Sequence, residues 1–406
     1  MIKTGKLNDR VASATVKNSD KNMTSFRNEE EFEDALIEYL QNIGGTKQWK
    51  YEPHIKTEEQ LWANFKAILE RNNQGKLGKN PHLSPSEFEQ VKREILRECR
   101  TPYSAGRWIY GINGITQVEI TRDSEDNSRI AQDGSETAHK VQDHVYLDVF
   151  DQANVGAGNT VYQIVNQIQR EPAHARNKKR RFDTTLLING LPMIHIEEKW
   201  DKHDALEGLY QIQQYIDEGV FTGIYSTTQI LVGLTPHESR YMANTDSEHF
   251  NTDFAFRWQR KEDSKPVWDW REFCDKMLSI PMAHRMATQY MILDGEKERQ
   301  KLIVMRPYQV YATEKVIEQL RKHVFGTDPQ EVGYIWHTTG SGKTISSFKT
   351  AWLASRLPNV NKVIFVVDRK ALTKQTYDNY HAYDPDATDE GLGIVADTKN
   401  TRDLYK

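Results

Sequence analysis

The sequence predicts an α/β fold in two or three domains, and three observations support this prediction. Stretches of strand-like composition alternate with stretches of helical periodicity along the 406 residues. Residues 182–200 contain two β-rich runs joined by Asn189-Gly190, which is typical of a β-hairpin. Residues 332–355 give an apolar run, a glycine-rich loop and a helix in that order, and this alternation indicates a parallel α/β sheet.

The composition is that of a globular protein with a substantial core. The hydrophobic fraction is 37% and the charged fraction is 28%. No run approaches the roughly 18 apolar residues of a membrane helix, and the polar N-terminus lacks the apolar region of a signal peptide. The two cysteines, Cys99 and Cys274, form neither a metal cluster nor a disulfide framework. We therefore expect a cytoplasmic protein with no membrane partner.

The predicted elements of the first 260 residues belong to one unit. Residues 1–25 are expected to be flexible. Residues 28–40 place Phe32, Leu36 and Leu40 on one helical stripe, opposite acidic residues. The segment 56–100 has a helical pattern with an internal break. Further along, the sequence predicts a polar loop at 121–140, strands at 145–150, 160–165 and 228–235, and a helix at 204–216.

The remainder is predicted to connect to a second unit. Residues 261–300 are expected to be a connecting segment. From residue 301 the composition changes, and the sequence predicts a helix at 306–324, a strand at 332–336, a helix at 345–355 and a buried strand at 361–367.

The segment HTTGSGKT, His337 to Thr344, is typical of a phosphate-binding loop. Its glycines allow a tight turn, in which backbone N–H groups point at an anion and the following helix adds the positive end of its dipole. Lys343 is expected to reach the outer phosphates of ATP, and the Thr344 hydroxyl to bind Mg²⁺. The expected nucleotide-binding residues in the loop are Thr339, Gly340, Ser341, Gly342, Lys343 and Thr344.

The loop departs from the common GxxxxGK[ST] pattern because His337 replaces its first glycine. In this it resembles superfamily 2 helicases and translocases. The segment RPYQ resembles the adenine-binding Q motif of that superfamily, with Gln309 on the base and Arg306 and Tyr308 packed on its ring. VVDRKAL (366–372) resembles the strand end that contacts DNA in such motors. No apolar strand ending in an acidic pair follows, so we expect this polypeptide to be unable to turn over ATP productively.

Asp183, Glu197 and Lys199 match the D-x13-E-x-K pattern of PD-(D/E)xK nucleases. Two carboxylates can share a Mg²⁺ ion that polarises a phosphate and activates water. Glu197 and Lys199 lie two apart on a strand and so share a face, which allows Lys199 to orient or deprotonate the water and to stabilise developing charge. Glu198 is expected to point the other way.

The register of the hairpin tests this prediction. In a two-residue turn at Asn189-Gly190, each residue of the first strand pairs with the residue of the second strand whose number brings the sum to 379. This register places Asp183 on the face opposite Glu197. A three-residue turn sets Asp183 directly across from Glu197. The site therefore requires a three-residue turn, or a bulge or bend near Asp183.

Three further features lie around this pattern. Gln211 and Tyr215 share a face of the predicted helix at 204–216 and resemble the QxxxY helix of RecB-type nucleases. Glu33 is either a solvated helix acid or an auxiliary carboxylate of the site. The basic run from His174 to Arg181 is either a solvated loop or a contact for DNA phosphates.

The order of these motifs resembles the restriction (R) subunit of type I restriction-modification enzymes, over most of residues 28–385. The resemblance implies an endonuclease domain of the RecB type at 26–260 and the first part of a RecA-like motor lobe at 301–406. It also implies double-stranded DNA as substrate, Mg²⁺ and ATP as cofactors, and modification and specificity subunits as partners, with the DNA target read by another subunit.

Two other hypotheses remain open. The chain could be a superfamily 2 helicase or remodeller with an inactive N-terminal module, or a non-enzymatic module that binds DNA through its basic run. Metal-dependent cleavage that is lost in Asp183 and Lys199 variants distinguishes the nuclease from both. A P-loop kinase fits less well, because RPYQ and HTTGSGKT together suit helicases.

Overall fold

The computed structural model describes residues 25–112, 114–122, 143–156, 158–171, 179–296, 299–324, 326–327, 333–387 and 393–397. Residues 1–24 of the predicted flexible N-terminus, residues 123–140 of the predicted loop and His174 to Lys178 of the basic run lie outside this range. Among the described helices, none has the length and apolarity required to cross a bilayer.

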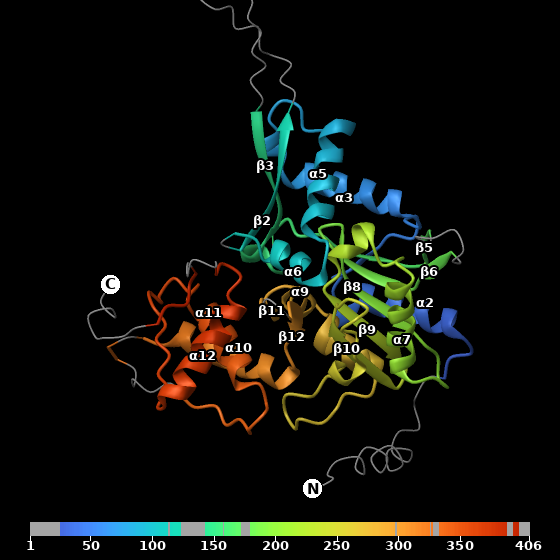
Figure 1. Cartoon of the computed structure of the whole chain (residues 1–406). Coiled ribbons are helices and arrows are strands. Elements are labelled where there is room, and N and C mark those ends of the chain that lie inside the picture. The colour runs from blue at the N-terminus through green and yellow to red at the C-terminus, as the bar shows by residue number, and fades with distance from the viewer. Residues whose placement is uncertain are drawn as a thin grey trace, which may run out of the picture.

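A six-stranded mixed sheet forms the centre of the fold, in the order β1-β4-β7-β8-β9-β10 (Figure 1). Neighbouring strands are antiparallel except for the parallel pairs β1–β4 and β8–β9. Every residue of β7, β8 and β9 is buried, which explains their nearly continuous apolar runs. The strands are β1 (Lys50–Tyr51), β4 (Tyr162–Val165), β7 (Thr184–Ile188), β8 (Leu191–Glu198), β9 (Ile230–Thr235) and β10 (Glu238–Ala243).

Helices α2 and α7 pack on this sheet, and most helices of this part begin with a side chain that caps the first turn. Asn28 caps α2 by accepting a hydrogen bond from the Glu31 backbone N–H, and Thr57, Ser84 and Asp204 form capping boxes at α3, α5 and α7. The sequence prediction of helices at 28–40 and 204–216 is confirmed. The helices of this part are α2 (Glu29–Gln41), α3 (Glu58–Asn72), α4 (Gln74–Leu77), α5 (Pro85–Glu98), α6 (Pro102–Tyr110) and α7 (Ala205–Asp217).

A long hairpin, β2–β3, projects from the sheet beside α5 (Figure 1). It consists of β2 (Ile115–Arg122) and β3 (Asp143–Asp151), so the predicted strand at 145–150 is confirmed. Thr121 and Arg122, predicted to lie in the polar loop, instead end β2. A shorter antiparallel pair joins β5 (Ile168–Arg170) to β6 (Arg180–Phe182), directly before β7.

The C-terminal part is mainly helical. A small sheet of β11 and β12 precedes α10, which packs against α11, and α11 packs against α12. The residues before this sheet fold into short helices whose apolar side chains join the same core; the Trp270 ring, for example, packs on Phe26 and Phe32. These elements are α8 (Trp270–Phe273), a π-helix (Cys274–Leu278), α9 (Met282–Ala287), β11 (Met291–Asp294), β12 (Lys301–Val304), α10 (Pro307–Lys322), α11 (Lys343–Ala354) and α12 (Lys370–Tyr383).

The sequence predicts strands at 332–336 and 361–367. This prediction is wrong for the described residues, because 333–336 and 361–367 form no strand. Their apolar side chains are exposed, with Tyr334 at 90%, Trp336 at 88% and Val366 at 85%. An extended segment becomes a strand only when a neighbour satisfies its backbone groups. Within the described ranges, no strand lies beside either segment to do so. The sequence predicts a parallel sheet next to the glycine loop. The central sheet of the structure is instead mixed, and it lies in the N-terminal part of the chain.

The register of the β7–β8 hairpin changes partway along its length. Asn189 and Gly190, with φ of 51° and 82°, form a two-residue turn, so that Ile188 pairs with Leu191. A bulge then shifts the register, and Leu186 pairs with Ile194. Continued by one residue beyond β7, this shifted register places Asp183 across from Glu197. The turn is the two-residue form, and the bulge supplies the change of register that the sequence prediction required.

Helix α7 approaches the sheet closely because two glycines face each other across the contact. A Cβ atom at Gly233 on β9 would lie 1.9 Å from the Ala205 backbone oxygen, and one at Gly208 on α7 would lie 2.7 Å from the Glu197 backbone oxygen. This close contact fixes the height of α7 above the end of β8.

Replacing Gly233 with alanine is expected to lower the free energy of unfolding by about 1–3 kcal/mol, because α7 must move away from the sheet. Urea unfolding of both proteins measures the loss. Gly75→Ala is the matched control: it lies in α4 with nothing within 4 Å of an added Cβ. Alanine there should be neutral or stabilise the helix by up to about 1 kcal/mol. Equal stability of Gly233→Ala and the parent would contradict the tight contact.

Candidate functional site

Three acidic side chains meet at the open end of the β7–β8 hairpin. Asp183 directly precedes β7, Glu198 ends β8, and Glu33 comes from α2. Ligand oxygens of the three carboxyl groups lie within 4.8 Å of one another. The Asp183 carboxylate accepts a hydrogen bond from the Glu198 backbone N–H at 3.2 Å, and the Glu198 carboxylate accepts one from the Thr184 backbone N–H at 3.3 Å. The two acidic side chains thus tie the strand ends together.

The expectation that Glu198 points away from Asp183 is wrong. Strand alternation separates the faces of a sheet only within paired strands. Glu197 and Glu198 are still paired with β9, but Asp183 lies outside β7, where no pleat fixes the direction of its side chain. Both Glu197 and Glu198 consequently lie near Asp183.

Glu197 is fully buried and held from the side of α7. The Tyr215 hydroxyl donates a hydrogen bond to its Oε1 at 3.0 Å, and the Gln211 amide donates to the same oxygen. Burial, followed by the negative charge of the nearby Glu197, raises the pKa of Asp183. The structure therefore brings Asp183, Glu197, Gln211 and Tyr215 together, as the sequence predicts.

Lys199 extends from the end of β8 toward α2. Its ammonium group donates a hydrogen bond to the Glu198 backbone oxygen at 2.7 Å and forms an ion pair with Glu29 at 3.2 Å. Burial alone would lower the pKa of Lys199, but Glu197, Asp183 and Glu29 together raise it. The ammonium group therefore stays charged beside the carboxyl groups. No motif in the sequence indicated Glu29, one of three acids that begin α2.

The carboxyl groups are hard to ionise in this position. Burial raises the pKa of Glu197 to about 7. Burial, followed by the charge of Glu197, raises the pKa of Asp183 well above its ordinary value, and burial with Asp183 and Glu33 does the same for Glu198. Buried like charges favour protonation unless a cation joins them.

Two oxygens of this group lack a donor. Oε2 of Glu197 and Oε1 of Glu198 are buried and accept no hydrogen bond from the described residues. An unsatisfied buried oxygen is costly, so such atoms require an explanation. A set of carboxylate oxygens with too few donors suits a hard divalent cation such as Mg²⁺.

Sequence reasoning did not identify two neutral residues that lie beside the acids. His195 Nε2 lies 3.3 Å from Glu197 Oε2, and its Nδ1 contacts the Thr185 hydroxyl at 3.0 Å. Burial lowers the pKa of His195 to about 4, so the imidazole is neutral. The Gln167 amide donates to both oxygens of Glu33, at 2.7 and 2.8 Å. Only the shared strand face of residues 195 and 197 could have indicated the histidine.

The described part of the basic run is largely paired with acids. Lys179 contacts Glu171 at 2.6 Å, where both side chains are exposed, and the Arg180 guanidinium binds Glu218. Arg181 is exposed. These contacts favour neither of the two interpretations of the run.

The glycine loop is held by the RPYQ segment. Gly340 and Gly342 have φ of 78° and 77°, in the left-handed region. The Tyr308 hydroxyl and the Gln309 amide both donate to the Ser341 backbone oxygen, at 2.7 and 3.0 Å. A Cβ at position 342 would lie 2.4 Å from the Gln309 amide nitrogen, so the glycine is required for this contact.

Other predicted nucleotide contacts lie close by. Lys343 begins α11, and its ammonium group donates to the Thr338 backbone oxygen at 2.9 Å. The Gln309 side-chain oxygen accepts from the Arg306 backbone N–H, and the Arg306 guanidinium lies 4.3 Å from the centre of the Phe256 ring. The predicted loop, lysine and Q-like segment are therefore adjacent, although the strand expected before the loop is missing.

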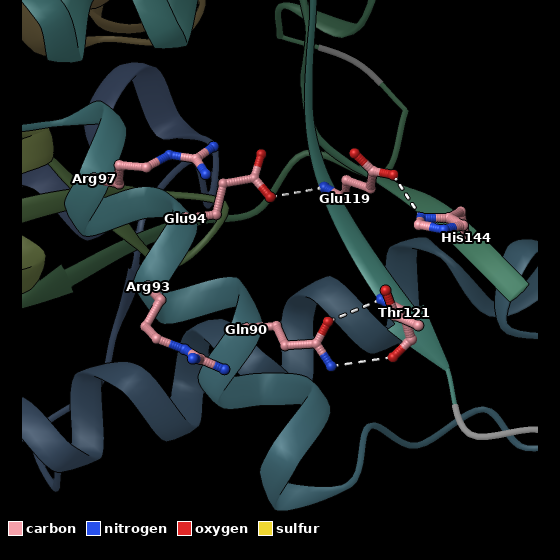
Figure 2. Close-up of a pocket in the computed structure, with 7 residues that line it drawn as sticks. All are labelled: Gln90, Arg93, Glu94, Arg97, Glu119, Thr121 and His144. Atoms are coloured by element: carbon pink, nitrogen blue, oxygen red, sulfur yellow. Dashed lines mark hydrogen bonds and ion pairs between the residues drawn. The ribbon is translucent and has the colours of Figure 1, made fainter. Parts of the chain in front are cut away.

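A hollow of about 490 Å³ lies apart from both sites, between α5 and the β2–β3 hairpin (Figure 2). Its polar groups bind one another: the Gln90 amide bonds the Thr121 backbone in both directions, Glu94 accepts from the Glu119 backbone N–H, and Glu119 contacts His144. We assign it no role.

Two family models match the chain. The family described as "Type I restriction enzyme R protein N terminus" matches residues 26–250, and the one described as "Type III restriction enzyme, res subunit" matches residues 302–405.

Relatives with the same kind of name cover most of the chain. The type I restriction enzyme SsaAORF53P endonuclease subunit of Staphylococcus saprophyticus is 31% identical over 94% of this chain and 35% of its own length. A Staphylococcus aureus subunit, SauMSSORF170P, is 30% identical over the same shares. The Escherichia coli EcoprrI endonuclease subunit is 27% identical over 77% of this chain and 88% of its own length. The chain thus spans about a third of the staphylococcal relatives.

The first family model covers more than half of the chain, in the part that contains Glu33, Asp183, Glu197 and Lys199. This chain belongs to the type I restriction enzyme R protein N-terminal family.

Proposed function

We propose that this chain carries the metal-dependent DNA-cleaving centre of a type I restriction enzyme, followed by the first nucleotide-binding elements of its motor. The observation that carries the proposal is the convergence of Asp183, Glu197 and Lys199 at one end of the hairpin, with Gln211 and Tyr215 bonded to Glu197. We interpret residues 26–260 as a PD-(D/E)xK nuclease domain, 261–300 as the connection and 301–406 as the start of a RecA-like lobe.

Asp183 and Glu197 would hold the cation of the nuclease centre. Their fit rests on the buried, unsatisfied oxygen of Glu197 and on the scarcity of donors around the carboxyl groups. A bound Mg²⁺ would polarise the scissile phosphate and lower the pKa of water.

The other side chains have separate roles. Tyr215 and Gln211 fix the orientation of Glu197 by donating hydrogen bonds to it. Lys199 has a raised pKa, so its charged ammonium group suits orienting water and stabilising charge on the phosphate better than accepting a proton.

The nucleotide site would consist of the loop from Thr339 to Thr344 together with Arg306, Tyr308 and Gln309. Lys343 would bind phosphate oxygens, Thr344 the Mg²⁺ that accompanies ATP, and Gln309 the adenine. By the family resemblance, the complete subunit would act in the cytoplasm with modification and specificity subunits. It would translocate double-stranded DNA and cleave it away from the recognition site.

The alternative of a superfamily 2 helicase with an inactive N-terminal module accounts less well for the buried acids. A purely structural module gains nothing from carboxyl groups that are buried without donors, since such groups are destabilising. A module that binds DNA only through its basic run leaves the same acids unexplained.

Replacing Asp183 with asparagine or Lys199 with alanine should each reduce plasmid cleavage at least about a hundredfold, because the first removes a carboxylate ligand of the cation and the second removes the positive charge beside the phosphate. The assay follows supercoiled plasmid as it becomes nicked or linear in Mg²⁺ or Mn²⁺. Lys202→Ala, an exposed lysine three residues from Lys199, should keep full activity. Cleavage that survives both variants would exclude this centre. Salt-dependent DNA binding by the parent chain, without cleavage in any metal, would favour the hypothesis of a DNA-binding module.

Replacing Lys343 with alanine should weaken Mg·ATP binding about tenfold to a hundredfold, because a charge-assisted hydrogen bond to phosphate is lost. Fluorescence titration with a labelled ATP analogue measures the affinity. Lys315→Ala, which removes an exposed lysine from α10, should leave it unchanged. An affinity that responds equally to both substitutions would contradict the assignment of the loop.

A further inference from the structure

We propose that His195 is a positioning residue of the nuclease centre and holds the Glu197 carboxylate for the cation. His195 belongs to a buried chain of hydrogen bonds that starts at the Tyr225 hydroxyl and passes through the Thr185 hydroxyl to the imidazole. The inference rests on the proposed nuclease function, because Glu197 is a proposed ligand of that cation. His195 would touch neither the ion nor the DNA and would act only through Glu197.

His195 and Glu197 each have one polar atom without a partner, and these two atoms lie close together. Both side chains are fully buried. Among the described residues, Nε2 of His195 and Oε2 of Glu197 form no hydrogen bond, yet they are 3.3 Å apart. An ordinary hydrogen bond is only roughly 0.3 Å shorter. Hydrogen bonds of active sites are often long before the ligands bind and tighten afterwards. The nitrogen and the oxygen can therefore serve as donor and acceptor for each other.

The contacts on the other side of the imidazole decide which nitrogen carries the proton. The Thr185 hydroxyl contacts Nδ1 of His195 at 3.0 Å and the Tyr225 hydroxyl at 3.1 Å. When Tyr225 donates to Thr185 and Thr185 donates to Nδ1, both hydroxyl protons have acceptors and the imidazole proton lies on Nε2. In the reverse direction, the Tyr225 proton is buried without an acceptor from the described residues, and the Nε2 lone pair faces a carboxylate. A buried donor without an acceptor is costly, so the first direction is favoured.

Aromatic rings enclose the imidazole. Three ring centroids lie 5.1, 5.5 and 6.1 Å from that of the imidazole, and they belong to Phe182, Phe221 and Tyr225. Such apolar surroundings disfavour a charged imidazole, so His195 carries a single ring proton. Close packing also restricts the rotation of the ring. The enclosure thus keeps the one proton of His195 available to Glu197.

The consequence is that Glu197 is held through both of its oxygens. Tyr215 and Gln211 donate hydrogen bonds to Oε1, and His195 would donate to Oε2. A carboxylate oxygen has two lone pairs, so Oε2 can accept the imidazole proton and still bind a cation. Removing an outer contact of this kind typically weakens metal binding about 10- to 100-fold.

The test measures the affinity for Mn²⁺ by isothermal titration calorimetry, without nucleotide or DNA. His195→Phe keeps a ring among the aromatic neighbours but removes the donor, and it should weaken Mn²⁺ binding about 10- to 100-fold. His195→Gln places an amide N–H near the position of Nε2 and should restore most of the affinity. His284→Phe is the matched control. His284 is also buried and contacts a hydroxyl, that of Tyr162 at 2.8 Å, and its variant should bind Mn²⁺ as the parent does.

A second measurement locates the proton directly. The ¹⁵N chemical shifts of the His195 ring, assigned by their absence in His195→Gln, should show the Nε2–H tautomer in the parent without metal. A histidine that serves only to fill space has no need of this tautomer. Thermal melting establishes that each variant is folded, and if His195→Phe does not fold, the tautomer decides the question.

The outcomes separate this inference from the proposed function. Parent-like affinity in His195→Phe, or an Nδ1–H tautomer, would overturn the role of His195 and leave the nuclease centre in place if Asp183→Asn and Glu197→Gln lose the ion. Equal losses in His195→Phe and His195→Gln would also overturn it, because the shape of the side chain would then matter and its donor would not. Mn²⁺ binding that is unaffected by Asp183→Asn and Glu197→Gln would overturn both proposals.

Discussion

The structure depends on one constraint: several carboxyl groups are buried together at the end of one hairpin, where they repel one another unless a cation joins them. The β7–β8 bulge brings Asp183 opposite Glu197, and the glycine contact between α7 and β9 brings Gln211 and Tyr215 down onto Glu197. Small changes in either contact would separate these groups. The apolar core around them supplies the stability that this arrangement costs.

Much of this arrangement could be predicted from local pattern. The hairpin, the helix that follows it and the QxxxY pair are encoded by residues close in sequence, and turn chemistry at Asn189-Gly190 fixes a two-residue turn. The position of the bulge could not be predicted, because nothing in the local sequence at Leu186 and Leu187 distinguishes it from the regular strand on either side. Glu198 was misplaced for a related reason, since Asp183 lies beyond the end of β7 and strand alternation does not fix the direction of its side chain.

Residues that act across long separations were the hardest to find. Glu29 and Gln167 reach the site from α2 and from the segment before β5, and no local motif in the sequence marks either of them. Conversely, the segments 333–336 and 361–367 have strand-like composition, yet they are exposed because the described residues offer them no partner strand. Composition indicates what a segment can form, and its neighbours decide whether it does.

A crystal structure of the chain grown with Mn²⁺, with the ion located by its anomalous scattering, tests the central claim most directly. The account predicts a peak with oxygens of both Asp183 and Glu197 within about 2.0–2.6 Å of it. Side chains that face different sides of the sheet, with no peak between them at saturating Mn²⁺, would contradict it.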